Sequence, residues 1–161
     1  MTSEELLSHA ALHSWKQVLE RFNKGLTSLG EDGFQKRVAP GRNRLYYLLG
    51  HLTAVHDRML PLLGIGDRLH SELDETFISN PDGKVSDPVS VAELLQAWSE
   101  VNSRLTSAFE RYSTEGWLDK HTAVSDEDFA ADPTRNRLAV VLNRTNHLSF
   151  HAGQFVLVNR D

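Results

Sequence analysis

The sequence predicts an all-α fold, a four-helix bundle in up-down-down-up order with a long crossover between the second and third helices. Two observations predict it: four stretches repeat their apolar residues with a helical period, and two long polar connections separate them. Because 161 residues suffice to bury a core, we expect one helical domain spanning residues 1–161.

The first helix is expected to begin at a cap on Thr2 or Ser3 and to end near Leu29, with Gly30 as its stop. Its apolar stripe consists of Leu12, Trp15, Val18, Leu19, Phe22 and Leu26. His9 and His13 project away from that stripe, so we expect them to face water.

The second helix is expected from about Asn43 to Leu63, with Pro61 fraying its last turn. Residues 64–89 are rich in Gly, Pro, Asp and Ser and predict a long connection. At about 3.3 Å per residue this connection can cross the length of a bundle, so the second and third helices can run parallel.

Ser90 and Glu93 form a capping-box pattern that opens the third helix, which is expected to end near Tyr112. A second polar connection covers residues 113–133. We expect Asp132-Pro133 to cap the fourth helix and that helix to run to about Val158.

Composition excludes several functions. The chain has 17 Lys and Arg against 22 Asp and Glu, without a basic stripe, so no nucleic-acid partner is expected. It has no cysteine, which excludes disulfides, thiolate ligands and a cysteine nucleophile. The N-terminus is acidic and no apolar run approaches about 20 residues, so we expect a cytoplasmic protein without a membrane partner.

Two histidines in the last helix, His147 and His151, are four residues apart and therefore share a helix face. A catalytic metal site usually has three protein ligands. His51 and His56 on the second helix are both candidates, but they lie about 140° apart around its axis. The up-down-down-up order favours His51 and an up-down-up-down order favours His56. Hydrogen-bonded structural histidines are the alternative interpretation, and His70 and His121 lie in polar connections.

The segment His147-x3-His151-x-Gly153-Gln154, together with Gly50-His51-Leu52 on the second helix, resembles the DinB-like superfamily of metal-binding four-helix bundles (DinB/YfiT type). The resemblance covers nearly the whole chain. It implies an up-down-down-up bundle with one divalent ion, most simply nickel or zinc, bound by His51, His147 and His151.

Related branches of that superfamily are thiol transferases and thiol-dependent isomerases. The resemblance therefore implies a metal-dependent enzyme that transfers a low-molecular-weight thiol to a small-molecule substrate, or a hydrolase. The alternative is a non-catalytic, self-associating bundle with a structural ion or none. Three neutral imidazoles suit several metals, so the sequence leaves the metal and the reaction open.

Several neighbouring residues are candidates for supporting roles. Gln154 is placed to hold a ligand imidazole or a metal-bound water, and Arg58 or Arg144 to meet an anionic substrate. Gly153 offers room for a neighbouring helix. We also expect a homodimer, for which Leu60, Leu62 and Ile65 form a candidate apolar patch.

Overall fold

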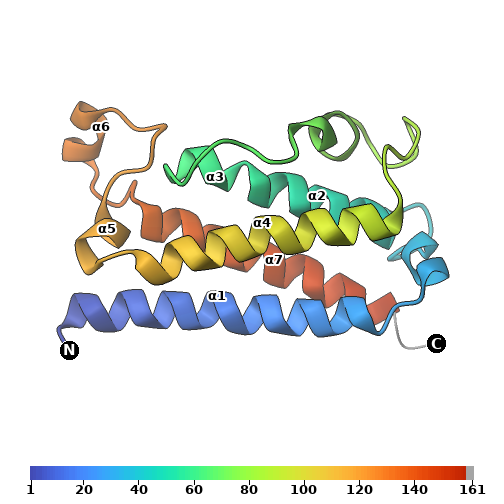
Figure 1. Ribbon diagram of the computed structural model, residues 1–161, viewed down its shortest axis with the longest axis horizontal. Coiled ribbons are helices and arrows are strands. Elements are labelled where there is room, and N and C mark those ends of the chain that lie inside the picture. The colour runs from blue at the N-terminus through green and yellow to red at the C-terminus, as the bar shows by residue number, and fades with distance from the viewer. Residues whose placement is uncertain (159–161) are drawn as a thin grey trace.

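The computed structural model describes residues 1–158, and within them the protein is helical, without a β-strand beyond isolated bridges. This confirms the all-α class. Its main helices are α1 (Ser3–Thr27), α2 (Leu45–Asp57), α4 (Val91–Arg111) and α7 (Arg137–Val158). Figure 1 shows α1 and α7 running in one direction and α2 and α4 in the other. α1 packs mainly along α7, and α2 along α4.

The N-terminal cap of α1 follows the sequence closely. The Thr2 hydroxyl accepts a hydrogen bond from the Glu5 amide at 3.2 Å, and the Glu5 carboxylate accepts one from the Thr2 amide at 2.6 Å. This capping box satisfies two amides that the first turn leaves without partners. The helix ends at Thr27, slightly before the predicted end, and Gly30 precedes the short 3₁₀ helix η1 (Glu31–Gln35).

The second predicted helix is divided in two. α2 ends at Asp57, and the short helix α3 (Met59–Leu62) continues after Arg58. Pro61 explains the break, because it lacks an amide hydrogen and its ring crowds the carbonyl four residues earlier, at Asp57. Pro61 therefore interrupts the helix one turn before the position at which fraying was predicted.

The connection between α3 and α4 is not wholly irregular. It contains a 3₁₀ turn, η2 (Ser71–Leu73), and one π-helical turn, η3 (Glu75–Ser79), which buries the side chain of Phe77 against α2. The sequence of this connection shows no helical period, and the packing of one aromatic ring organises it. The following helix, α4, has the capping box predicted at Ser90 and Glu93.

The second connection also contains helices that the sequence analysis did not predict, α5 (Thr114–Leu118) and α6 (Asp126–Ala131). The predicted start of the last helix was wrong. The Asp132 carboxylate accepts hydrogen bonds from Thr134, which forms a turn, and the Asn136 side chain accepts the amide of Ala139 at 2.9 Å. Asn136 thus caps a helix that begins at Arg137.

Two apolar clusters fill the bundle. One surrounds Phe22, Phe77 and Trp98, and the other surrounds Trp15, Leu60 and Phe109. Leu60 is fully buried, so it cannot contribute to the apolar surface patch predicted there, and Leu62 and Ile65 are half-buried. No helix within residues 1–158 has both the length and the apolar character required to cross a membrane.

Candidate metal centre

Three histidines from two helices converge where α2 faces α7. His51 comes from α2, and His147 and His151 come from successive turns of α7. One potential ligand atom from each residue lies within 4.8 Å of the others, and the Nε2 atoms of His147 and His151 are 3.1 Å apart. Two nitrogens that bind one zinc ion are at most about 4.2 Å apart. The upper limit of 4.8 Å among the three ligand atoms is therefore close to the spacing that one ion requires.

Hydrogen bonds to the second nitrogen orient two of these rings. Nδ1–H of His51 donates to the backbone carbonyl of Phe77 at 3.0 Å, and Nδ1–H of His151 donates to the side-chain oxygen of Gln154 at 2.7 Å. These tautomers, assigned from the hydrogen-bond network, leave the Nε2 lone pair free for a metal. The Nδ1 atom of His147 is buried without a partner. The three imidazoles thus fit a divalent ion, and the ring of His147 is held less firmly than the other two.

Gly50 explains how a backbone carbonyl reaches His51. A Cβ atom at position 50 would overlap the ring of Phe77, so only glycine allows this ring to lie directly on α2. The Phe77 carbonyl then lies over the next residue, His51. The pairing Gly50-His51 in the sequence therefore serves two linked purposes, close packing of the crossover and orientation of a candidate ligand.

Ion pairs hold the crossover against both ends of α2. At the start of α2, Arg44 binds the carboxylates of Asp82 and Asp87 at 2.7 and 2.8 Å. Near its end, Arg68 joins the fully buried Asp57 at 2.9 Å and Asp74 at 2.6 Å. Phe77 lies between these two anchors along the chain, so the position of its carbonyl does not depend on its own packing alone.

Burial keeps His147 and His151 neutral by lowering their pKa values. It is the main cause that lowers the pKa of His147 to about 4, and the charges of His151, His51 and Arg144 lower it further. Burial also lowers the pKa of His151, against the opposing effect of its hydrogen bond to Gln154. Imidazoles that are neutral at pH 7 bind a metal without first losing a proton.

His56 lies apart from this group. Its ring is fully buried between Trp15 and Trp98, with centroid separations of 5.2 and 5.1 Å, and its Nδ1–H donates to Asn102 at 2.7 Å. Burial lowers its pKa to about 3. Of the two candidates on α2, the structure thus brings His51, and not His56, to the pair on α7.

The remaining histidines lie outside the candidate metal centre. His9 and His13 are exposed, as expected. His70 is not an isolated solvent histidine, because its ring lies 3.3 Å from the carboxylates of both Glu72 and Glu100. His121 is half-buried.

The residues that were predicted to support the metal site do not all lie where they could do so. Gln154 holds a candidate ligand as predicted, but Arg58 is paired with Asp74 at 2.6 Å. Gly153 is exposed and a Cβ there would meet no atom within 4 Å, so it permits no close helix contact within the described chain. Arg144 is half-buried one turn before His147.

A cavity of about 520 Å³ lies next to the candidate metal site. His151 and Gln154 form one side, and the opposite side comes from the segment that precedes α2, including Arg42 and Asn43. Leu48 and Leu157 add apolar surface. The volume is within the usual range for small-molecule sites, so a ligand bound there can reach the histidines.

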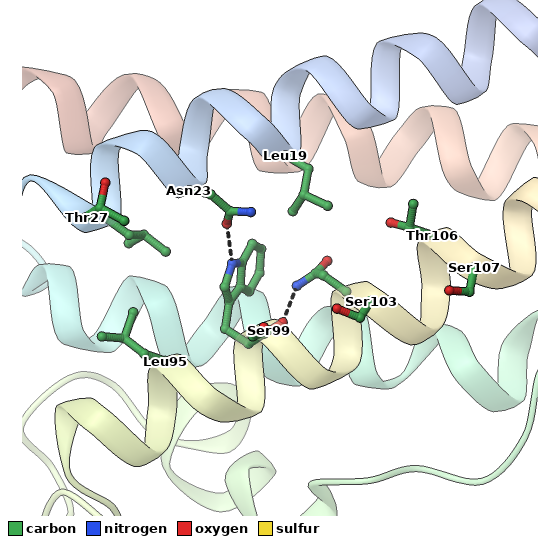
Figure 2. Close-up of a pocket in the computed structure, with 11 residues that line it drawn as sticks. Leu19, Asn23, Thr27, Leu95, Ser99, Ser103, Thr106 and Ser107 are labelled. Atoms are coloured by element: carbon green, nitrogen blue, oxygen red, sulfur yellow. Dashed lines mark hydrogen bonds between the residues drawn. The ribbon is translucent and has the colours of Figure 1, made fainter.

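A second cavity, of about 480 Å³, lies between α1 and α4 (Figure 2). Uncharged groups line it, among them Ser99, Ser103 and Thr106 from α4. Trp98 donates to Asn23 across it at 2.8 Å. Because it has no ionisable side chain in its lining, it offers neither imidazole nor carboxylate ligands for a metal, and no acid or base.

Three features of the site were not predicted from the sequence: the carbonyl of Phe77, the packing role of Gly50 and the side of the cavity around Arg42. Phe77 lies in a polar connection without helical period, so no local pattern connects it with His51. The adjacency of Gly50 and His51 was the available signal, because a glycine inside a helix often marks a close contact.

Comparisons with known proteins bear on the family of the chain and on its fold. The family model described as the DinB superfamily matches residues 14–155. A solved structure of a conserved protein from Enterococcus faecalis is 18% identical, with a TM-score of 0.65 over 99% of this chain and 96% of that chain. This structural likeness shows the fold alone. No curated protein matches the chain significantly.

Proposed function

Because the chain belongs to the DinB superfamily, we propose that it is a divalent-metal-dependent enzyme whose zinc or nickel ion is bound by His51, His147 and His151. The observation that carries the proposal is the convergence of three imidazoles, two of them oriented through their second nitrogens. The proposal includes the up-down-down-up order, which the helix directions in Figure 1 support.

The proposed reaction is transfer of a low-molecular-weight thiol to a small electrophile, with hydrolysis as the alternative reaction of the same site. A divalent ion bound there lowers the pKa of a coordinated thiol or water and so supplies a nucleophile near neutral pH. The chain contributes the cavity beside His151, in which Arg42 and Asn43 face the substrate. It has no cysteine to compete for the ion. We place this reaction in the cytoplasm, where such thiols are kept reduced.

The test begins with protein purified without a histidine tag. We expect about one equivalent of zinc or nickel per chain, and thiol transfer to a chromogenic electrophile that stops when a chelator removes the ion. His151→Ala should lose both properties. The matched control is His13→Ala, which removes an exposed histidine of α1 and should lose neither. Metal-free wild-type protein with full activity would overturn the proposal.

A second candidate function is self-association without catalysis. It is favoured by exposed apolar side chains on α7 beside the site: Phe150 is 65% exposed and Leu157 is 71% exposed. A homodimer that uses this surface is compatible with either function. Sedimentation of wild type and Phe150→Ser, with and without chelator, distinguishes them. A dimer that persists without metal, in a protein that shows no turnover, favours the non-catalytic function.

A further inference from the structure

Arg144 has a half-buried guanidinium that pairs with no residue in the described part of the chain. Within residues 1–158 no carboxylate lies within ion-pair distance of it, and no side chain or carbonyl accepts its hydrogen bonds. Burial lowers its pKa, and no acidic neighbour offsets this effect. Arg44, by contrast, binds two carboxylates. A partly desolvated cation is costly unless something pairs with it, so the unpaired guanidinium of Arg144 favours a bound anion.

The position of Arg144 relates this cation to the candidate metal centre. It precedes His147 by three residues on α7, so the two side chains are neighbours on one helix face. A helical side chain leans toward the N-terminal end of its helix, which brings the His147 ring over the turn that contains Arg144. The charge of Arg144 also acts on His56 of α2. Arg144 therefore lies where α2 faces α7.

A second unsatisfied group belongs to the same neighbourhood. The Nδ1 atom of His147 is buried and has no hydrogen-bond partner, unlike the Nδ1 atoms of His51 and His151. If Nε2 of His147 ligates a metal, Nδ1 carries the proton and needs an acceptor. The described chain supplies that acceptor for the other two ligands and not for this one.

We propose that Arg144 and Nδ1–H of His147 form a binding site for an oxyanion, the carboxylate or phosphate group of a small ligand, beside the metal centre. The inference rests on the proposed function, because metal ligation fixes the proton on Nδ1 of His147. A guanidinium donates two parallel hydrogen bonds to such a group, and the imidazole donates a third. The substrate of the proposed enzyme is accordingly an acid, oriented with its reactive end toward the ion.

The test measures anion binding directly. Zinc-loaded wild type, Arg144→Gln and Arg144→Lys are titrated calorimetrically with succinate and, separately, with inorganic phosphate at constant ionic strength. We expect Arg144→Gln to bind the preferred anion about ten- to a hundredfold more weakly while its zinc affinity is unchanged. Arg144→Lys should lie between the two, because it retains a charge without the planar fork. The control Arg21→Gln, which removes an exposed arginine of α1, should match wild type.

The two anions distinguish the source of the oxyanion. Tighter, Arg144-dependent binding of succinate identifies an organic carboxylate, and the reverse order identifies phosphate. Equal affinities for wild type and Arg144→Gln overturn the inference, as does wild type that binds neither anion.

A metal-free arm separates this inference from the proposed function. The nitrogen resonances of labelled histidine are followed in the apoprotein during the same titrations. If the protein binds no metal, the proposed function fails. Because the guanidinium of Arg144 is charged with or without the ion, the apoprotein should still bind the anion in an Arg144-dependent way, more weakly than the zinc-loaded protein; no Arg144-dependent binding in the apoprotein overturns the site. Circular dichroism of each variant confirms folding, and Arg144→Lys replaces Arg144→Gln if the latter does not fold.

Discussion

Two histidines on one helix, His51 and His56, illustrate how surroundings decide the role of an imidazole. His51 is half-buried, its Nδ1–H is held by a backbone carbonyl, and its ring faces two further histidines. His56 is fully buried between two tryptophan rings, and its Nδ1–H is held by Asn102. Both rings have one nitrogen fixed. They differ in which groups lie within reach of the other nitrogen, Nε2.

The Nε2 atom of His56 is buried without a hydrogen-bond partner among the described residues, inside an aromatic enclosure. His51 instead faces the half-buried ring of His147 on α7, with ring centroids 5.3 Å apart. The comparison teaches that a histidine on an apolar helix face becomes a candidate ligand only where a second helix brings more ligands to it. His56, a histidine five positions further along the same helix, serves packing instead.

The largest contrast between the two regions should appear in metal affinity. His151→Ala removes one of three ligands, and we expect zinc affinity to fall about a thousandfold, or about 4 kcal/mol, with the fold retained. His56→Gln should leave the affinity unchanged, because His56 is not among the converging imidazoles. Calorimetric titration of both proteins tests this. Comparable losses in the two variants would remove the distinction between the regions.

A substitution behind His51 should affect both stability and affinity. Gly50→Ala forces a methyl group into the ring of Phe77, and we expect a loss of about 3 kcal/mol in the free energy of unfolding. The displaced Phe77 carbonyl should also weaken zinc binding. Urea unfolding and zinc titration measure the two effects. Gly153→Ala is the matched control, since its Cβ meets no atom within 4 Å and the site tolerates it. Full zinc affinity in a destabilised Gly50→Ala protein would show that the carbonyl does not orient His51.

Acid should act on the His56 region in a defined direction. In the unfolded chain His56 takes up a proton near its ordinary pKa of 6.5, whereas in the folded protein it stays neutral down to about pH 3. The unfolded state thus binds more protons in this window, so the stability is complete above pH 6.5 and is lost as the pH falls. We expect this residue to contribute a loss of about 2 kcal/mol between pH 6.5 and 5.

The measurement compares urea unfolding of apo wild type with apo His56→Gln across that range. His147 and His151 also have lowered pKa values and keep some pH dependence in both proteins. The wild type should therefore show the steeper slope, by about 1.4 kcal/mol per pH unit. Parallel slopes would mean that the buried imidazole takes up its proton without cost.

The smallest effect concerns the orientation of one ligand. Gln154→Leu removes the acceptor of the His151 Nδ1–H, and we expect about a tenfold loss of zinc affinity with little change in stability. Gln154→Glu keeps an acceptor and should retain or raise the affinity. Zinc titration of these two variants decides whether the hydrogen bond matters beyond packing. An unchanged affinity in Gln154→Leu would show that the ring is held by its neighbours alone.

Local patterns predicted much of this molecule, because they report on local forces. The capping boxes at Thr2 and Ser90 and the apolar stripes follow from interactions within one turn, and the structure contains them. The approach of His51 to the pair on α7 was expected from the height of the residues along the helices. The start of α7 was misplaced because Asp132 and Asn136 compete for the same role, and their side-chain hydrogen bonds decide between them.

Other features depend on contacts between distant segments. The Phe77 carbonyl reaches His51 across 26 residues of sequence, and the short helices around it have no periodic signal. Leu60 was expected in an apolar surface patch with Leu62 and Ile65, yet tertiary packing buries it fully. That Arg144 has no partner among residues 1–158 likewise emerges only when the surroundings of its side chain are known.

The contact of Phe77 with Gly50 makes the crossover a partner in ligand binding. The segment that contains Phe77 packs on α2 and orients His51. If an ion binds the oriented ring more tightly, linkage requires the bound ion to stabilise the packed position of this segment in turn. Amide exchange around residues 75–79 should accordingly slow when zinc is added, although this segment supplies no metal ligand.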